Sequence, residues 1–371
     1  MIWTPDNVRC IVLDAAGRIL GQPHAGLPTN VSPALNLYHD LGLNSLQRME
    51  LAALINEFFG IFQTSAANYL LAQTGLDHWV ECILRARAEN DNALTFRTSG
   101  TGGQAKAITH TMASLLAEGR FLGRLLGPPG PVISMVPTHH IYGFLYTIVL
   151  PALWQQPLQL LADTTRSTLP ANALLIGTPF TWEYLSQSLP PGERLPIRGV
   201  SSTAPMPPAL FIHLLNRGLP LTEIYGSSET GGLAYRHHSD HDFTLFPYWQ
   251  LQPGQSPGEP PTVSHTNTGQ TYAIPDRIEH RLNGTIRVLG RFDEAVQIAG
   301  VNVYPAHVRA VIESCPLVAE ADVYAKADAG VVQLYGAVRL RTHNEANRAA
   351  CLRWFGERLS APEFPKHLYL Y

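Results

Sequence analysis

The most informative part of this 371-residue sequence is the run Leu94-Thr95-Phe96-Arg97-Thr98-Ser99-Gly100-Thr101-Gly102-Gly103-Gln104-Ala105-Lys106. Its apolar start predicts a strand, and after the burst of Thr, Ser and Gly, Thr111 can cap a helix that runs to about Leu126. Glycines let a backbone approach an anion closely, while hydroxyls, N–H groups and the Lys106 charge can bind it. The run therefore predicts a phosphate-binding loop, with a plain Gly-rich turn as the alternative.

Composition restricts the class of protein. Apolar residues make up 45% of the chain and charged residues 15%, which is typical of an ordered globular protein. A net charge of −3 predicts neither a nucleic-acid nor a membrane partner. The four cysteines are scattered, and we find neither a secretion signal nor an apolar run of about 18 residues, so we expect a cytoplasmic location.

Three domains are predicted from the order of the patterns. Residues 1–88 show four helical segments, which begin near Val8, at Asn44-Ser45, near Ala66 and at Leu76. After a polar junction at 88–92, strands and helices alternate as in an α/β domain. We expect an all-α four-helix domain over 1–88, an α/β core over 93–291 and a small α+β domain over 292–371.

The loop resembles the TSGTTGxPK segment of the ANL superfamily of adenylate-forming enzymes. Its spacing differs from the Walker A pattern, because Ala105 precedes Lys106 and no Ser or Thr follows it. The resemblance implies that the loop binds the phosphates of ATP and that Lys106 is catalytic. The implied phosphate-binding residues are Thr98, Ser99, Gly100, Thr101, Gly102 and Gly103.

Two later segments resemble nucleotide-binding motifs of the same superfamily. Tyr225-Gly226-Ser227-Ser228-Glu229 is similar to YGxTE, which implies that Tyr225 stacks on adenine, Ser228 binds the α-phosphate and Glu229 holds Mg²⁺. The segment 198–207 resembles the SGGAPLP turn, whose backbone borders the adenine at Ala204.

A third segment matches the ribose-binding pattern and the hinge that follows it. Asp276, Gly284, Gly290 and Arg291 reproduce the family spacing, which implies that Asp276 binds the ribose hydroxyls and that Arg291 is a catalytic residue holding ribose and phosphate oxygens. Asp293 matches the pivot about which the family's C-terminal domain rotates.

The acid substrate is predicted from the segment Pro137-Thr138-His139-His140-Ile141-Tyr142-Gly143, which is similar to the family's PxFHxxG. The resemblance places His140, Tyr142 and Gly143 at the acyl pocket. Because the segment has no Asp to pair with an ammonium group, we expect a carboxylic acid without an α-amino group, and the nearby aromatics favour an apolar or aryl acid. The histidines at 237–241 lack metal-ligand spacing and predict an exposed loop.

The helical region resembles acyl carrier proteins. Asp40-Leu41-Gly42-Leu43-Asn44-Ser45-Leu46, followed by Glu50-Leu51 and 58–61, is similar to the DLGLDSL signature. The resemblance implies a covalent 4′-phosphopantetheine on Ser45, attached by a phosphopantetheinyl transferase. Asn44 stands where Asp is usual, and the alternative is that Ser45 is the N-cap of an ordinary helix.

The chain also departs from the family pattern. The family's first subdomain looks shortened, and residues 362–371 resemble the segment just before the family's catalytic lysine. We expect slower adenylation without that lysine, unless Lys326 or Lys366 substitutes for it or Lys106 and Arg291 suffice.

Three functions follow as hypotheses. In the first, the enzyme uses ATP and Mg²⁺ to activate an acid and loads its own Ser45 thiol for a downstream acyl-accepting synthase, in secondary-metabolite or fatty-acid-type biosynthesis. The second transfers the acyl group to CoA or an external carrier protein. The third is a catalytically degenerate fold that serves as a carrier or docking protein.

Overall fold

The computed structural model describes residues 3–22, 35–66, 69–98, 106–160, 170, 172–188, 190, 194, 197–254, 259–281, 284–291, 295–328 and 331–371. The chain divides into two compact units. The first contains the residues up to Thr98 together with Lys106–His241, and the second contains Asp242–Tyr371. Among the described residues, no helix is long and apolar enough to cross a membrane.

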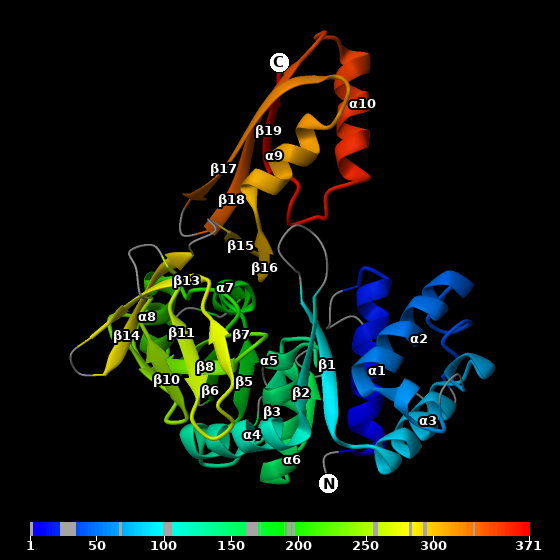
Figure 1. Ribbon diagram of the computed structural model, residues 1–371, viewed down its shortest axis with the longest axis vertical. Coiled ribbons are helices and arrows are strands. Elements are labelled where there is room, and N and C mark those ends of the chain that lie inside the picture. The colour runs from blue at the N-terminus through cyan, green and yellow to red at the C-terminus, as the bar shows by residue number, and fades with distance from the viewer. Residues whose placement is uncertain are drawn as a thin grey trace. The chain divides into compact units, whose positions relative to one another are not determined.

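The first unit begins with helices, coloured blue in Figure 1. The α-helices are α1 (Pro5–Ile19), α2 (Ser45–Phe59) and α3 (Leu76–Glu89), and the single 3₁₀ turns are η2 (Ile61–Gln63) and η3 (Leu70–Ala72). The shorter helix predicted around Ala66 to Leu71 is not confirmed, because the described part of that range holds only the 3₁₀ turn η3. So short a segment cannot offset the cost of helix nucleation, and it ends where the backbone becomes extended at Gln73.

The α/β part of the first unit is built on a largely parallel sheet with strand order β8-β7-β6-β5-β3-β4, in which only β7 and β8 are antiparallel. Its strands are β3 (Val132–Ser134), β4 (Leu158–Leu160), β5 (Leu174–Gly177), β6 (Arg198–Ser201), β7 (Leu221–Ser227) and β8 (Gly231–Arg236). Buried apolar residues of β5 and β7 pack with α7 (Pro179–Ser188) and α8 (Pro208–Asn216). The α/β alternation predicted for this region is therefore present.

Other helices of this part come directly after the loop and after β3. Thr111 accepts a hydrogen bond from the Ser114 backbone and caps α4 (Met112–Leu126), as predicted. A helical run follows from Ile141 and consists of α5 (Ile141–Gly143), the π-helical η5 (Phe144–Val149) and α6 (Leu150–Trp154). At Gly119 of α4 a Cβ atom would lie 2.5 Å from Val149, so glycine permits the close packing of α4 on η5.

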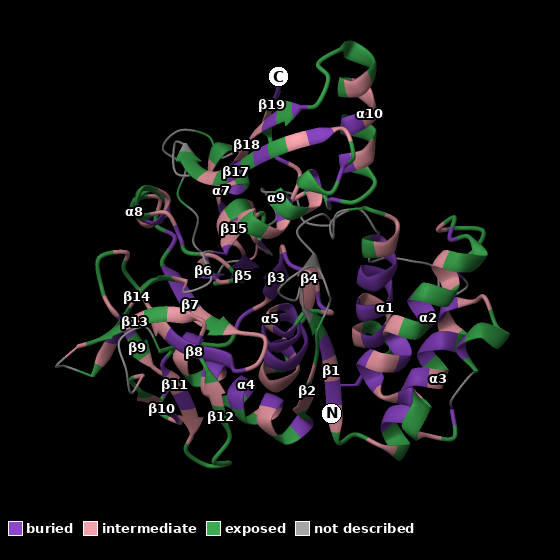
Figure 2. Ribbon diagram, turned by 45° about the horizontal axis from the view of Figure 1, so that its top comes forward, coloured by how far each residue is buried: buried purple, intermediate pink, exposed green. Residues whose placement is uncertain are grey.

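The helical region and the α/β part share one buried core (Figure 2). The rings of Trp3 and Phe58 lie 5.9 and 6.0 Å from that of Phe144, and the ring of Phe96 lies 5.6 Å from it. Arg87, 4% exposed, donates to the carbonyls of Phe59 and Ala93. The carrier-like helices are thus packed against the α/β elements by aromatic contacts and buried hydrogen bonds.

The second unit contains several small sheets. Its strands are β9 (Phe243–Leu245), β10 (Trp249–Gln252), β11 (Thr262–His265), β12 (Thr271–Ala273), β13 (Asp276–His280), β14 (Thr285–Arg291), β15 (Val296–Ile298), β16 (Val301–Val303), β17 (Val318–Asp328), β18 (Val331–Leu340) and β19 (His367–Leu370). The strands pair as β13-β14-β9, β10-β11-β12, β15-β16 and β17-β18-β19. The helices α9 (Pro305–Glu313) and α10 (Glu345–Gly356) share a core with the last of these sheets, as expected for a small α+β C-terminal subdomain.

Candidate active site

Two antiparallel strands carry the predicted phosphate-binding loop. β1 (Ala93–Thr98) pairs with β2 (Lys106–Thr111), and Thr98 stands directly opposite Lys106. The predicted strand before the loop is confirmed. Residues 99–105, with the predicted sites Ser99, Gly100, Thr101, Gly102 and Gly103, lie outside the described residues.

Lys106 meets the predicted metal ligand. Its Nζ lies 3.3 Å from the Glu229 Oε1, although 123 residues separate the two. Both side chains remain accessible, with Lys106 64% and Glu229 37% exposed, so the ion pair itself contributes little stability. What matters chemically is that a cation and a carboxylate stand side by side where a ligand can reach them.

The turn that carries Glu229 joins β7 to β8. At Gly226 a Cβ atom would lie 2.1 Å from the Gly231 carbonyl oxygen, so this position of the YGxTE-like motif requires glycine. The Ser227 backbone N–H donates to the Thr230 hydroxyl, which closes the turn locally. Tyr225 is half-buried at the end of β7.

Two residues that the sequence analysis did not single out hold the same turn. The His110 Nε2 lies 2.7 Å from the Ser228 carbonyl oxygen, and the Gly232 N–H donates to the Glu118 Oε1 at 2.7 Å. Burial lowers the pKa of His110, and burial raises the pKa of Glu118 to about 8. The only sequence signal for Glu118 was its position, since it is a charged residue among the apolar positions of α4.

The predicted adenine-side turn follows β6, and its backbone is strained. Thr203, next to Ala204, has a φ of 77°, a conformation that a β-branched residue rarely adopts. Nearby, the buried Glu223 accepts from the Met206 N–H at 2.9 Å and pairs with Arg236 at 2.7 Å. These contacts tie the turn to β7, the strand that carries Tyr225.

The predicted acyl-pocket segment is anchored to α1. The Asp14 carboxylate, 7% exposed, accepts from the Thr138 backbone N–H at 2.7 Å and from its hydroxyl at 2.5 Å. His140 follows on the same segment and is exposed.

The other two predicted pocket residues have clear structural roles. The Tyr142 hydroxyl lies 2.9 Å from the Gly177 carbonyl and 3.1 Å from the Val200 carbonyl, and so bridges the ends of β5 and β6. At Gly143 a Cβ atom would lie 1.8 Å from the Pro137 carbonyl oxygen, which explains why this motif position is glycine.

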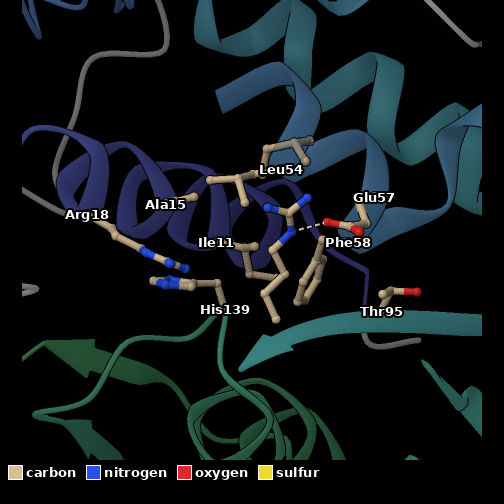
Figure 3. A pocket seen from close by; sticks show the side chains of 10 residues that line it. Ile11, Ala15, Arg18, Leu54, Glu57, Phe58, Thr95 and His139 are labelled. Atoms are coloured by element: carbon tan, nitrogen blue, oxygen red, sulfur yellow. Dashed lines mark hydrogen bonds and ion pairs between the residues drawn. The ribbon is translucent and has the colours of Figure 1, made fainter. Parts of the chain in front are cut away.

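A small cavity lies between α1, α2, β1 and the segment that carries His139 (Figure 3). Its walls are apolar at Ile11, Leu54 and Phe58 (Figure 3), and Arg97 and Glu57, which form an ion pair, also line it. Its volume of about 30 Å³ is far below the several hundred Å³ of a typical ligand pocket, so it is too small for an acyl group. We therefore do not assign the acid substrate to this cavity.

In the second unit, a β-bulge brings the predicted ribose-binding pair together. Asp276 and Arg291 stand directly opposite each other on β13 and β14, and the register shifts between Arg277 and Ile278. Gly290 beside the bulge has a φ of 129°, and Gly284 has a φ of 82°, which explains both glycines of the motif. The predicted pivot Asp293 lies outside the described residues.

The predicted carrier serine is the first residue of α2 and is exposed. The N-cap is Asn44, whose side chain accepts from the Gln47 backbone while Gln47 bonds back to Asn44. The alternative that Ser45 itself is the N-cap is therefore wrong. An Asn caps a helix about as well as an Asp, so the substitution at 44 preserves this helix start.

The described residues fit a magnesium–nucleotide complex better than a metal bound by protein alone. No group of three or more His, Cys, Asp or Glu residues that could hold a metal was found among them, so the His237–His241 region carries no such cluster. Mg²⁺ commonly takes one or two carboxylates and completes its shell with substrate phosphates and water. An accessible Glu229 beside Lys106 matches that need.

Known proteins with similar sequences place these residues in context. Residues 59–277 match the family described as AMP-binding enzyme, and residues 10–68 match the phosphopantetheine attachment site. A 4-coumarate–CoA ligase of Rhodobacter capsulatus is 36% identical over 88% of this chain and 85% of its own length. Another, of Halorhodospira halophila, is 34% identical over 88% of this chain and 83% of its own length.

Solved structures share the fold at low sequence identity. The o-succinylbenzoate CoA synthetase of Bacillus subtilis superposes with a TM-score of 0.61 and 18% identity, over 76% of this chain and 66% of that one. The amide bond synthetase of Marinactinospora thermotolerans gives a TM-score of 0.63 and 17% identity, over 75% of this chain and 65% of that one.

Proposed function

Because the chain belongs to the AMP-binding enzyme family and carries a phosphopantetheine attachment domain, we propose that it loads its own Ser45 with an activated acid. In the first step a carboxylate oxygen attacks the α-phosphorus of ATP, which forms an acyl-adenylate and releases pyrophosphate. In the second, the phosphopantetheine thiol attacks the acyl carbon, which forms a thioester and releases AMP and a proton. Both steps balance without an oxidant or reductant.

The observation that carries the adenylation step is the meeting of Lys106 and Glu229 at 3.3 Å. Lys106 holds phosphate oxygens as negative charge moves onto the leaving pyrophosphate, and Glu229 holds Mg²⁺, which neutralises phosphate charge when bound. The Ser228 hydroxyl binds the α-phosphate, the Tyr225 ring stacks on adenine beside the Ala204 backbone, and Thr98 with the loop that follows binds the other phosphates. A carrier or docking protein without catalysis would need none of these residues, so we do not propose the degenerate fold.

Asp276 and Arg291 supply the ribose contacts in this proposal. A carboxylate can accept from both ribose hydroxyls, while a guanidinium can donate to ribose and phosphate oxygens. Their opposed positions across β13 and β14 support a joint role. Asp293 remains our proposal for the hinge.

The acid is proposed to be an aryl or other apolar carboxylic acid without an α-amino group. The segment 137–144 itself carries no carboxylate that could pair with an ammonium group. The two relatives covering 88% of this chain are described as ligases of 4-coumarate, an aryl acid.

The acceptor has a second candidate. Ser45 is exposed, and its hydroxyl is not used to cap α2. Both features favour modification of Ser45 by a phosphopantetheinyl transferase and loading of the acyl group onto this same chain. Two observations favour free CoA instead: the similar relatives are described as CoA ligases, and α1–α3 pack firmly on the α/β elements. A carrier fixed in this way moves only its arm, so loading between chains is a further route.

One experiment separates the acceptors. Phosphopantetheinylated protein is incubated with ATP, Mg²⁺ and a panel of aryl acids, and the intact chain is weighed by mass spectrometry. An acyl mass that is absent in Ser45→Ala supports self-loading, whereas AMP release that requires CoA and is unaffected by Ser45→Ala supports the CoA ligase. Absence of pyrophosphate exchange with every acid, together with no ATP binding, would refute both.

The roles of the ion pair are tested separately. Glu229→Gln keeps the shape of the side chain but should lose Mg²⁺-dependent ATP–pyrophosphate exchange. Lys106→Met should lower the rate of this exchange by about 100-fold or more. Arg97→Met offers a matched control, because it also removes an exposed cation paired to a glutamate, but one at the α2 side of β1. Unchanged rates in Glu229→Gln would rule out its assignment.

A further inference from the structure

We propose that His110 and Glu118 are positioning residues that hold the turn 228–232, and with it the Glu229 carboxylate, ready for magnesium and phosphate. This inference rests on the proposed function, because it adds two residues to the same adenylation site. Neither residue belongs to the phosphate-loop motif, the YGxTE-like motif or the ribose-binding motif.

Three contacts join one short segment to one turn. Lys106 reaches the Glu229 side chain at 3.3 Å, His110 reaches the Ser228 carbonyl at 2.7 Å, and Glu118 receives the Gly232 N–H at 2.7 Å. Lys106, His110 and Glu118 all lie within residues 106–118, directly after the predicted phosphate loop. Their three contacts fall within residues 228–232, so the turn is held on both sides of Glu229.

His110 is placed for this contact by the strand. It lies four residues after Lys106 on β2, and even spacing puts both side chains on the same face. A carbonyl oxygen only accepts, so the His110 Nε2 must carry the proton that is donated. The lowered pKa of His110 agrees with a neutral ring, and the ring lies 5.9 Å from that of Phe96, which restricts its rotation.

Glu118 holds the other end of the turn from α4. Its side chain is packed so closely that a Cβ atom at Gly231 would lie 2.4 Å from the Glu118 Oε2. Gly231 also has a φ of 69°, so glycine is required there for backbone and packing reasons alike. A residue that is 8% exposed and bonded to the backbone resists displacement of the turn.

The expected consequence is on metal binding rather than on folding alone. Without either contact, the turn samples more conformations, and Glu229 pays an ordering cost when it binds Mg²⁺. More Mg²⁺ is then needed for the same activity. A residue that merely stabilised the fold would lower the amount of active enzyme without changing the Mg²⁺ requirement.

The test uses the full-length variants His110→Leu, His110→Gln, Glu118→Leu and the control Thr109→Val. Gln keeps an N–H donor, whereas Thr109 is exposed and bonds to Thr95 on the neighbouring strand rather than to the turn. Two readouts are taken: amide hydrogen exchange of peptides covering 227–233 without ligand, and the Mg²⁺ concentration for half-maximal ATP–pyrophosphate exchange.

We expect His110→Leu and Glu118→Leu to raise both readouts about tenfold, the loss expected for one hydrogen bond. His110→Gln should recover most of the loss, and Thr109→Val should match the wild type. Unchanged amide hydrogen exchange of the turn in His110→Leu overturns the inference. Faster hydrogen exchange spread evenly over the first unit overturns it as well. If the wild type exchanges no pyrophosphate, the proposed function fails, and hydrogen exchange of the turn alone then decides the positioning role.

Discussion

Replacing Asp14 by alanine tests whether helix α1 is an integral part of the adenylating unit. Asp14 accepts two hydrogen bonds from Thr138, at 2.7 and 2.5 Å, and Thr138 is fully buried. Hydrogen bonds to a charged group contribute about 1.5–3 kcal/mol each, and the variant leaves two donors without this acceptor. We therefore expect Asp14→Ala to lower the free energy of unfolding by about 3–5 kcal/mol.

The assay is urea unfolding followed by hydrogen-exchange mass spectrometry, which reports on peptides of the first unit separately from those of the second. Asp6→Ala is the matched control, because Asp6 is on the same helix and its side chain is 91% exposed. It should change stability by less than about 0.5 kcal/mol. Asp14→Asn should fall between the two, since its amide oxygen still accepts.

The integral role of α1 also predicts which peptides lose protection from hydrogen exchange in Asp14→Ala. Peptides from α1 and from 131–150 should become less protected together, because one contact joins them. A loss below about 1 kcal/mol, or one confined to α1, would refute the reasoning, since buried donors left without an acceptor cost more than that.

Three other predictions concern single residues. Thr203→Gly should stabilise the protein by roughly 0.5–1 kcal/mol in thermal unfolding, because it relieves a β-branched residue at a φ of 77° and the added chain entropy offsets part of the gain; a loss of stability would contradict the strain. Burial raises the pKa of Glu118 in the folded protein to about 8, above its unfolded value, so its contribution to the free energy of unfolding is complete below pH 4.5 and is lost as the pH rises towards 8. The difference in free energy of unfolding between the wild type and Glu118→Gln should fall over this pH range, and a difference that does not change with pH would contradict the prediction. Tyr142→Phe should cost about 1–2 kcal/mol in urea unfolding, because the carbonyls of Gly177 and Val200 lose their shared donor, and a neutral effect would show that water replaces it.

Local features were predictable because nearby residues specify them. The cap at Thr111 and the helix starts at 111–112 and 44–45 agree with the sequence patterns, since a cap needs only a short polar side chain three residues from its partner, although at the second start the cap is Asn44 and not Ser45. Gly284 and Gly290 stand where the backbone has a positive φ, which other residues rarely adopt. The helix expected near Ala66 is not confirmed beyond a 3₁₀ turn, because a segment of about six residues is too short for local preference to decide.

The sequence by itself determined the order of the motifs, the positions of α1, α2, α3 and α4, the strand before the loop, and the family to which the chain belongs. Only the tertiary structure decided that Lys106 stands beside Glu229, that His110 and Glu118 hold the same turn, and that Asp14 ties helix α1 to the segment 137–143. The physical reason is that each of these contacts joins residues more than 100 positions apart. Their side chains meet through the packing of strands and helices, which no local pattern encodes.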